Sequence, residues 1–219
     1  MSAGHEELLE AITEVVLAQV RAELAAQGRF QVEASGRHVH LSTQDAKELF
    51  GDDYALLWKK YLSQPGQFVG KQRVCLVGPK GRLENVVVIG PERAQTQIEV
   101  SVTDAKALGV DPPCRDSGNL EETPSITIEN GNACVKTRGG LIIAERHIHM
   151  KPEAAAALGL RDGDRVGFDL DSSRPLTFKR VRVRVSPDAD NFMHIDYDEA
   201  NAAGFIKGMF GVICAAKDT

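Results

Sequence analysis

The chain has 219 residues, of which 42% are hydrophobic and 26% are charged, and its formal net charge is -5. A chain of this length can bury a substantial core, as one large domain or two small ones. The acidic balance argues against general binding to nucleic acid or to a membrane surface, and no apolar run of the sequence is long enough to span a bilayer. The N-terminal segment lacks a signal-peptide pattern, so we expect a cytoplasmic protein.

The first predicted element is an amphipathic helix over residues 6–27. Its apolar stripe consists of Leu8, Leu9, Ile12, Val15, Val16, Val20 and Leu24. These positions recur at the spacing of one helix face, and Gly28 follows as a stop signal. Two roles remain open for this helix, which are packing on the body of the protein and docking on a partner.

After Gly28 the chain is rich in short strands separated by turns. One longer helix is predicted over residues 52–62, because the segment ends before Pro65-Gly66. Residues 110–124 are predicted to form an irregular loop. Three strand pairs are predicted at residues 74–77 and 86–89, 125–129 and 133–137, and 165–170 and 176–185. Short strands between turns, with few long helices, favour small β-barrels.

Five of the six histidines lie in three short motifs. The motifs are Arg37-His38-Val39-His40, Arg146-His147-Ile148-His149 and His194-Ile195-Asp196. In a strand, residues i and i+2 point to the same side, so each His-x-His pair can direct both imidazoles at one ion. Histidine is the commonest metal ligand, and this concentration therefore predicts metal binding rather than core packing.

The sequence around these motifs repeats. Alanine and leucine follow at the sixth and ninth positions after His40 and after His149, and a fourth copy of the pattern begins at Glu99. Each copy is predicted as a strand that ends at the candidate ligand, a tight turn and a short helix. A merely structural repeat would explain the alanine and leucine positions, but not the ligand-type residues at the strand ends.

The repeats supply six candidate donors in two sets. The first half of the chain contributes His38, His40 and Glu99, and the second half contributes His147, His149 and His194. Sets of three such ligands are typical of catalytic zinc, which keeps one coordination position open, although iron and nickel also accept these ligands. We therefore expect a mainly β fold with short α-helices, in which two β-barrels have the metals between them.

The four cysteines have no C-x-x-C spacing, which argues against a disulfide framework or a cysteine-ligated zinc. Cys75, Cys134 and Cys214 lie in apolar, strand-like runs, and we expect them in the core. Cys114 is expected in an accessible loop, and a catalytic thiol remains an alternative.

Several separated motifs resemble the PduL-type phosphate acyltransferases, the phosphotransacylases of bacterial microcompartments. The motifs are Gly36–Ser42, Gly90-Pro91 through Arg93, Thr96–Glu99, Arg115–Gly118 and Ile143–Met150. The resemblance implies two β-barrel domains capped by short helices, one over residues 37–144 and the other over residues 28–36 plus 145–219, after the helical segment 1–27. It also implies two zinc ions at a site between the barrels, bound by the six donors in the two sets above.

The reaction implied by this resemblance is acyl-CoA plus phosphate giving acyl phosphate plus coenzyme A, with short acyl chains such as propanoyl or acetyl. In that family the position of Arg93 contacts phosphate, and the position of Ser117 lies beside it. We expect direct transfer, without a covalent acyl-enzyme. Arg180, Arg182 and Arg184 alternate with valines, so they predict a basic strand face that either receives the phosphates of coenzyme A or is simply solvated.

The same resemblance gives residues 1–27 a role as an encapsulation peptide, which would dock on shell or core proteins inside a bacterial microcompartment. A homodimer is also expected. The alternatives are a zinc-dependent thioester hydrolase, a cupin-like metalloenzyme and a non-enzymatic scaffold held by zinc. The spacing of His147, His149 and Glu153 suits a cupin, but Pro152 predicts that a helix begins there and carries the glutamate away.

Overall fold

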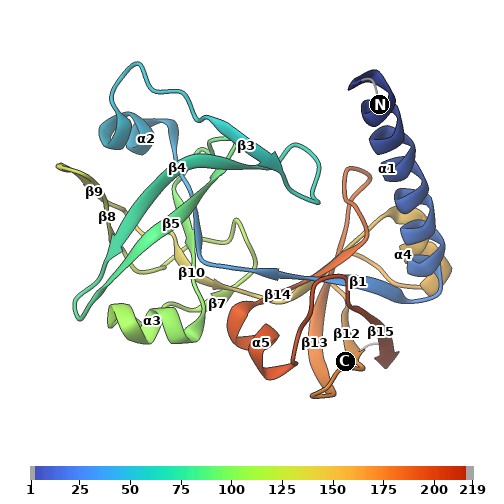
Figure 1. Ribbon diagram of the computed structural model, residues 1–219. Helices are drawn as coiled ribbons and strands as arrows, with labels where there is room; N and C mark the ends of the chain where they lie inside the picture. The colour runs from blue at the N-terminus through green and yellow to red at the C-terminus, as the bar shows by residue number, and fades with distance from the viewer. Residues whose placement is uncertain (1–2, 216–219) are drawn as a thin grey trace. The chain divides into compact units, whose positions relative to one another are not determined.

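The computed structural model describes residues 3–215 and divides the chain into two compact units (Figure 1). Unit 1 comprises Met1–Glu33, Arg146–His194 and Ala202–Thr219, as far as these segments are described, and unit 2 comprises Ala34–Glu145 and Ile195–Asn201. Residues 1–2 and 216–219, which fall within the predicted segments 1–27 and 145–219, lie outside the described residues. Among residues 3–215, no helix has the length and apolarity needed to cross a membrane.

Unit 1 is built on a closed barrel of six strands in the order β1-β14-β11-β13-β12-β15. The strands are β1 Arg29–Ser35, β11 His147–Met150, β12 Arg165–Leu170, β13 Leu176–Val185, β14 Phe192–Asp196 and β15 Phe210–Ala215. Ile148, Val181, Val183 and Met193 are fully buried. Because side chains alternate along a strand, the neighbours of these residues project from the outer face of the barrel. The predicted mainly β fold with a barrel is confirmed.

Unit 2 holds a nine-stranded sheet in the order β7-β10-β6-β2-β5-β4-β8-β9, with β3 paired to β4. The strands are β2 His38–His40, β3 Trp58–Tyr61, β4 Phe68–Val77, β5 Arg82–Gly90, β6 Gln97–Glu99, β7 Cys114–Arg115, β8 Thr127–Asn130, β9 Ala133–Lys136 and β10 Leu141–Ala144. Its core includes Val39, Leu76, Val88 and Ile98. A second β-barrel was expected over residues 37–144. The strands observed there form a sheet whose hydrogen-bonded order runs from β7 at one end to β9 at the other.

Four short helices follow the strands that carry the candidate ligands, as the repeats predict. They are α2 Thr43–Phe50, α3 Val102–Leu108, α4 Pro152–Leu158 and α5 Tyr197–Ala202. Ser42 and Ser101 cap α2 and α3, and Ser101 forms a reciprocal capping box with Asp104. Pro152 opens α4, where its missing N–H removes no helical hydrogen bond. The caps of α2 and α3 fix where β2 and β6 end, and they therefore place His40 and Glu99 at the ends of these strands.

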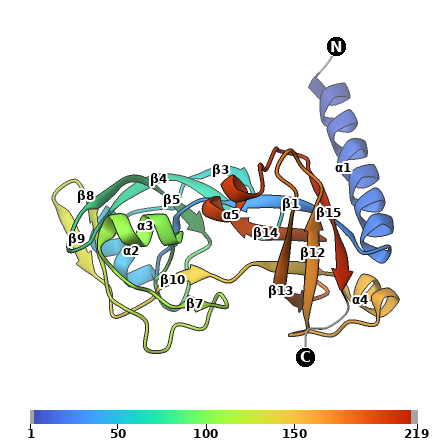
Figure 2. The same ribbon diagram turned by 90° about the horizontal axis from the view of Figure 1, so that it is seen from below.

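The predicted N-terminal helix is α1, which spans Ala3–Ala26. Its C-terminal end packs within unit 1, because Ala25 is buried and Arg21 lies 3.3 Å from Asp190 and over the ring of Phe192. Figures 1 and 2 show this end beside α4, whereas the N-terminal part projects away from the barrel strands. The apolar stripe of that projecting part is exposed, and Val15 reaches 70% exposure.

The helix predicted over residues 52–62 is wrong. The helix α2 ends at Phe50, Gly51 follows with a φ of 94°, and Trp58–Tyr61 form β3. β3 pairs with β4 in an antiparallel ladder, in which Tyr61 lies opposite Phe68. Pairing with β4 holds Trp58–Tyr61 in an extended conformation, and this tertiary pairing outweighs the local helix propensity.

The cysteine predictions are right in two cases and wrong in two. Cys75 is buried and Cys114 is exposed, as expected, although Cys114 lies in strand β7 rather than in a loop. Cys134 and Cys214 are exposed as well. In β9 the buried residue is Val135, so its neighbour Cys134 points to the other face of the strand. The apolar runs around Cys134 and Cys214 thus correctly predicted strands, but they did not predict the face of the strand on which each thiol lies.

Candidate metal centres

Three histidines of unit 1 form the first candidate centre. His147 of β11 pairs in register with His194 of β14, and His149 lies two residues further along β11. The three ring centroids lie 4.7 to 5.2 Å apart, and one donor atom from each ring lies within 4.8 Å of the other two. Because Ile148 between them points into the barrel, His147 and His149 share its outer face.

The geometry of this group fits a bound cation. The Nε2 atoms of His147 and His149 lie 3.1 Å apart. Two nitrogens bound to one tetrahedral zinc at about 2.0–2.1 Å would lie roughly 3.3 Å apart. Burial, together with the neighbouring charges of His194 and Arg184, lowers the pKa of His149 to about 3. His149 is therefore neutral near pH 7, which is the form of imidazole that binds metals.

The second candidate centre lies in unit 2. His38 and His40 come from β2, and Glu99 of β6 lies opposite His38 in the antiparallel ladder. One donor atom from each of the three again lies within 4.8 Å of the others. His38 Nδ1 donates to the carbonyl of Gly36 at 2.8 Å, because a carbonyl can only accept. In a neutral ring this contact leaves the lone pair on Nε2 of His38, which lies 3.5 Å from Glu99 Oε2.

Arg93 and Ser117, predicted from the resemblance, meet beside this second centre. Arg93 Nη2 lies 3.0 Å from His40 Nε2, and because guanidinium nitrogens only donate, His40 accepts here. Burial, with His38 and Arg93 as neighbouring charges, lowers the pKa of His40 to about 2, so the ring is neutral. Arg93 Nη1 donates to Ser117 Oγ at 3.3 Å.

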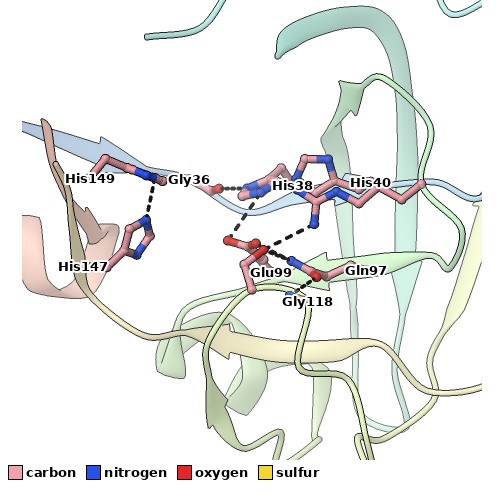
Figure 3. A network of polar contacts seen from close by, with 10 residues as sticks. Gly36, His38, His40, Gln97, Glu99, Gly118, His147 and His149 are labelled. Carbon is pink, nitrogen blue, oxygen red and sulfur yellow. Dashed lines mark hydrogen bonds and ion pairs between the residues drawn. The ribbon is translucent and has the colours of Figure 1, made fainter. Parts of the chain in front are cut away.

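Two further residues that the sequence reasoning missed contact candidate ligands. The amide of Gln97, which is 1% exposed, donates to Glu99 Oε1 at 2.6 Å (Figure 3). Gln97 lies two residues before Glu99 and so on the same face of β6, a signal that could have found it. Glu33 Oε2 lies 3.2 Å from His194 Nε2, and only the folding of β1 into the barrel brings them together.

The three arginines of β13 differ in their position along the strand pairing. Arg182 and Arg184 lie in register with His147 and His149 of the neighbouring strand β11. Side chains in register project to the same face of a sheet, so Arg182 and Arg184 flank the three-histidine group. Arg180 has a φ of 56° and lies where the pairing of β13 with β12 shifts, so the strict alternation is interrupted at this residue.

The cupin-like spacing is not used in the described structure. Pro152 opens α4, so Glu153 lies in that helix. The third donor beside His147 and His149 is His194 of β14. The helix start that Pro152 predicts is confirmed, and the ligand set is the one expected from the repeats rather than from the cupin spacing.

The unit 2 centre combines two histidines, of which His40 is held neutral, and a glutamate with an adjacent arginine, which suits an enzyme that stabilises an anionic substrate. The model of the phosphate propanoyltransferase family matches residues 31–206. The chain is 50% identical over 206 residues to the phosphate propanoyltransferase of Enterococcus faecalis (strain ATCC 700802 / V583), covering 94% of this chain and 98% of that protein. It is 48% identical over 203 residues to the phosphate propanoyltransferase of Clostridioides difficile (strain 630), covering 93% and 95%.

The chain therefore belongs to the phosphate propanoyltransferase family, and it is a phosphate acyltransferase. A relative from Thermotoga maritima (strain ATCC 43589 / DSM 3109 / JCM 10099 / NBRC 100826 / MSB8), also named phosphate propanoyltransferase, is 51% identical over 173 residues, which cover 78% of this chain and 82% of that protein. The resemblance that the separated sequence motifs indicate is confirmed.

Proposed function

We propose that this enzyme transfers a short acyl group, such as propanoyl or acetyl, from coenzyme A to inorganic phosphate. A phosphate oxygen attacks the thioester carbonyl, the new C–O bond forms, and the C–S bond breaks to release coenzyme A as its thiolate. The observation that carries this proposal is that Arg93 contacts both His40 and Ser117. Two side chains that can donate hydrogen bonds to an anion, Arg93 and Ser117, therefore lie beside a candidate metal centre. The names of the relatives support phosphate as the acceptor and propanoyl as an acyl group.

We propose zinc as the metal of both centres, with His38, His40 and Glu99 holding one ion and His147, His149 and His194 the other. When bound, zinc would polarise a phosphate or carbonyl oxygen and accept the sulfur of the thiolate. Three donors from the chain leave coordination positions open for such ligands. Both donor sets fit, because His40 and His149 are held neutral and the Nδ1 hydrogen of His38 is fixed by Gly36.

Arg93 and Ser117 bind phosphate in this proposal. The planar guanidinium of Arg93 can donate two parallel hydrogen bonds to phosphate oxygens and stabilise the negative charge that grows on the carbonyl oxygen. The Nε2 lone pair of His40 cannot serve Arg93 and an ion at once. If His40 binds the ion through that atom, Nη2 of Arg93 is released for substrate. Arg182 and Arg184, beside the three-histidine group, receive the phosphates of coenzyme A.

The N-terminal helix is proposed to dock on shell or core proteins of a bacterial microcompartment, inside which the enzyme would work as a homodimer. The exposed apolar stripe of α1 supports a docking role, because a helix with one free apolar face can bind in a groove of a partner. The packed C-terminal end, with Ala25 and Arg21, belongs to unit 1. Docking is therefore assigned to the projecting part of the helix alone.

The proposed reaction is tested with purified, zinc-loaded enzyme, propanoyl-CoA and phosphate. Release of the coenzyme A thiol should require phosphate, and propanoyl phosphate should form in equal amount. Thiol release at the same rate in water alone would instead show a thioester hydrolase. Mass spectrometry of enzyme incubated with propanoyl-CoA and no phosphate should find no acyl adduct, and a stoichiometric adduct would reject direct transfer.

A further inference from the structure

The side-chain amide of Gln97 joins a candidate metal ligand to the proposed phosphate-binding residues. Its Nε2 lies 2.6 Å from Glu99 Oε1, and its Oε1 lies 2.9 Å from the backbone nitrogen of Gly118 (Figure 3). The same Nε2 lies 2.7 Å from Ser117 Oγ. The residue is 1% exposed, so water does not compete for these contacts. All partners lie in unit 2.

These contacts determine the orientation of the Gln97 side-chain amide, that is, the positions of its oxygen and its nitrogen. The backbone N–H of Gly118 can only donate, so the Gln97 atom facing it is the carbonyl oxygen. The NH2 group therefore faces Glu99 and Ser117, and its two hydrogens match these two acceptors. A flipped amide would set its oxygen against the carboxylate of Glu99, where two acceptors repel.

The same contacts fix the role of the Ser117 hydroxyl. Its oxygen faces Gln97 Nε2 at 2.7 Å and Arg93 Nη1 at 3.3 Å, and both of these nitrogens can only donate. A hydroxyl has two lone pairs and one hydrogen, so both lone pairs of Ser117 are used. Its hydrogen is then directed to a third group, and an anionic oxygen is the partner that binds such a donor most strongly.

We propose that Gln97 is a positioning residue for both halves of this site. It holds Oε1 of Glu99, which leaves Oε2 directed toward His38, and it makes Ser117 a hydrogen-bond donor for phosphate. The first effect concerns metal binding alone. The second rests on the proposed function, because it requires phosphate as the ligand. Residues that hydrogen-bond to a metal ligand in this way typically change metal affinity about 10–100-fold when they are replaced.

The first test measures zinc affinity without substrates, by competition with a chromogenic chelator. In Gln97→Met and in the near-isosteric Gln97→Glu, one of two zinc ions should bind about 10–100-fold more weakly, while the other is unchanged. Gln44→Met is the matched control, since Gln44 Nε2 donates to Glu48 Oε1 at 3.1 Å on the exposed face of α2. The retained ion at the three-histidine group reports that unit 1 is folded, and a far-UV circular dichroism spectrum equal to that of the wild type checks that the strands of unit 2 remain folded. Unchanged affinity for both ions, or equal loss of both, would overturn the proposal.

The second test is a double-mutant cycle with Gln97→Met and Ser117→Ala, in which the Michaelis constant for phosphate is measured. Each single change should raise this constant by about tenfold, and the double variant should show little more than one single change. The constant for acyl-CoA should stay within about twofold in each case. If the Michaelis constant for phosphate rises in the double variant by the product of the two single effects, the coupling of Gln97 to Ser117 is rejected. A wild-type enzyme that fails to use phosphate would reject the proposed function, whereas the zinc titration would still decide whether Gln97 holds Glu99.

Discussion

The Nε2 atoms of His147 and His149 lie 3.1 Å apart on the outer face of the barrel. At this distance one ring can donate a hydrogen bond to the other, and when both nitrogens present lone pairs instead, they can bind one cation together. We expect about two zinc ions per chain in the wild type and about one in His149→Ala, measured by elemental analysis. His5→Ala, which changes the exposed histidine of α1, is the control and should keep both. Negligible bound metal in the wild type, with turnover that resists chelators, would contradict the metal assignment.

Arg93→Lys should damage the use of phosphate far more than the binding of acyl-CoA. Lysine keeps the charge but loses the planar fork that contacts both His40 and Ser117. Steady-state kinetics should show kcat/KM for phosphate lower by about 100-fold, the range seen when one oxyanion donor is lost. Arg82→Lys serves as the control, because Arg82 is exposed and pairs with Glu84 and Glu129. Equal rises in the Michaelis constants for both substrates would argue for a structural role of Arg93.

The candidate ligands were predictable from the sequence because strand periodicity and helix caps are local. His38 and His40 share a face since they lie two residues apart, and Ser101 caps α3 through a contact three residues away. The contact of Glu33 with His194 was not predictable, because 161 positions separate the two residues and only closure of the barrel joins them. The strand formed by Trp58–Tyr61 was missed for the same reason, since its partner β4 decides its conformation.

Arg184→Glu should raise the Michaelis constant for acyl-CoA, by about tenfold, if β13 receives the phosphates of coenzyme A. Arg184 lies in register with His149, and its charge already acts on that ring. Arg180→Glu is the matched control on the same strand, because the alternation is interrupted at this residue, and it should have a smaller effect. The comparison is best made at low and high salt, since a true charge contact weakens as salt increases. Equal effects of the two reversals would favour general attraction over a defined contact.

Deletion of residues 1–17 should leave catalysis intact and abolish docking. The described side chains in this stretch of α1 are largely exposed, whereas Arg21 and Ala25 further along the helix pack within unit 1. We expect kcat/KM within about twofold of the wild type, and loss of co-sedimentation with purified microcompartment shells. Deletion of residues 1–27 would also remove the packed end, so it should lower the melting temperature. A shortened enzyme that still sediments with shells would contradict docking through α1.

Chelator-treated protein should lose stability as the pH falls from about 7 to about 5. Burial lowers the pKa of His40 from 6.5 to about 2, so the unfolded chain binds a proton over this range and the folded one does not. The contribution of His40 is therefore fully present above pH 6.5 and declines as the pH drops below it. Between pH 7 and pH 5, the neutral His40 ring of the folded state should lower the free energy of unfolding by about 2 kcal/mol. Urea denaturation of His40→Asn should show a shallower pH dependence by this amount. His5→Asn should keep the wild-type slope, and an unchanged slope in His40→Asn would mean that His40 takes up its proton in the folded state as well.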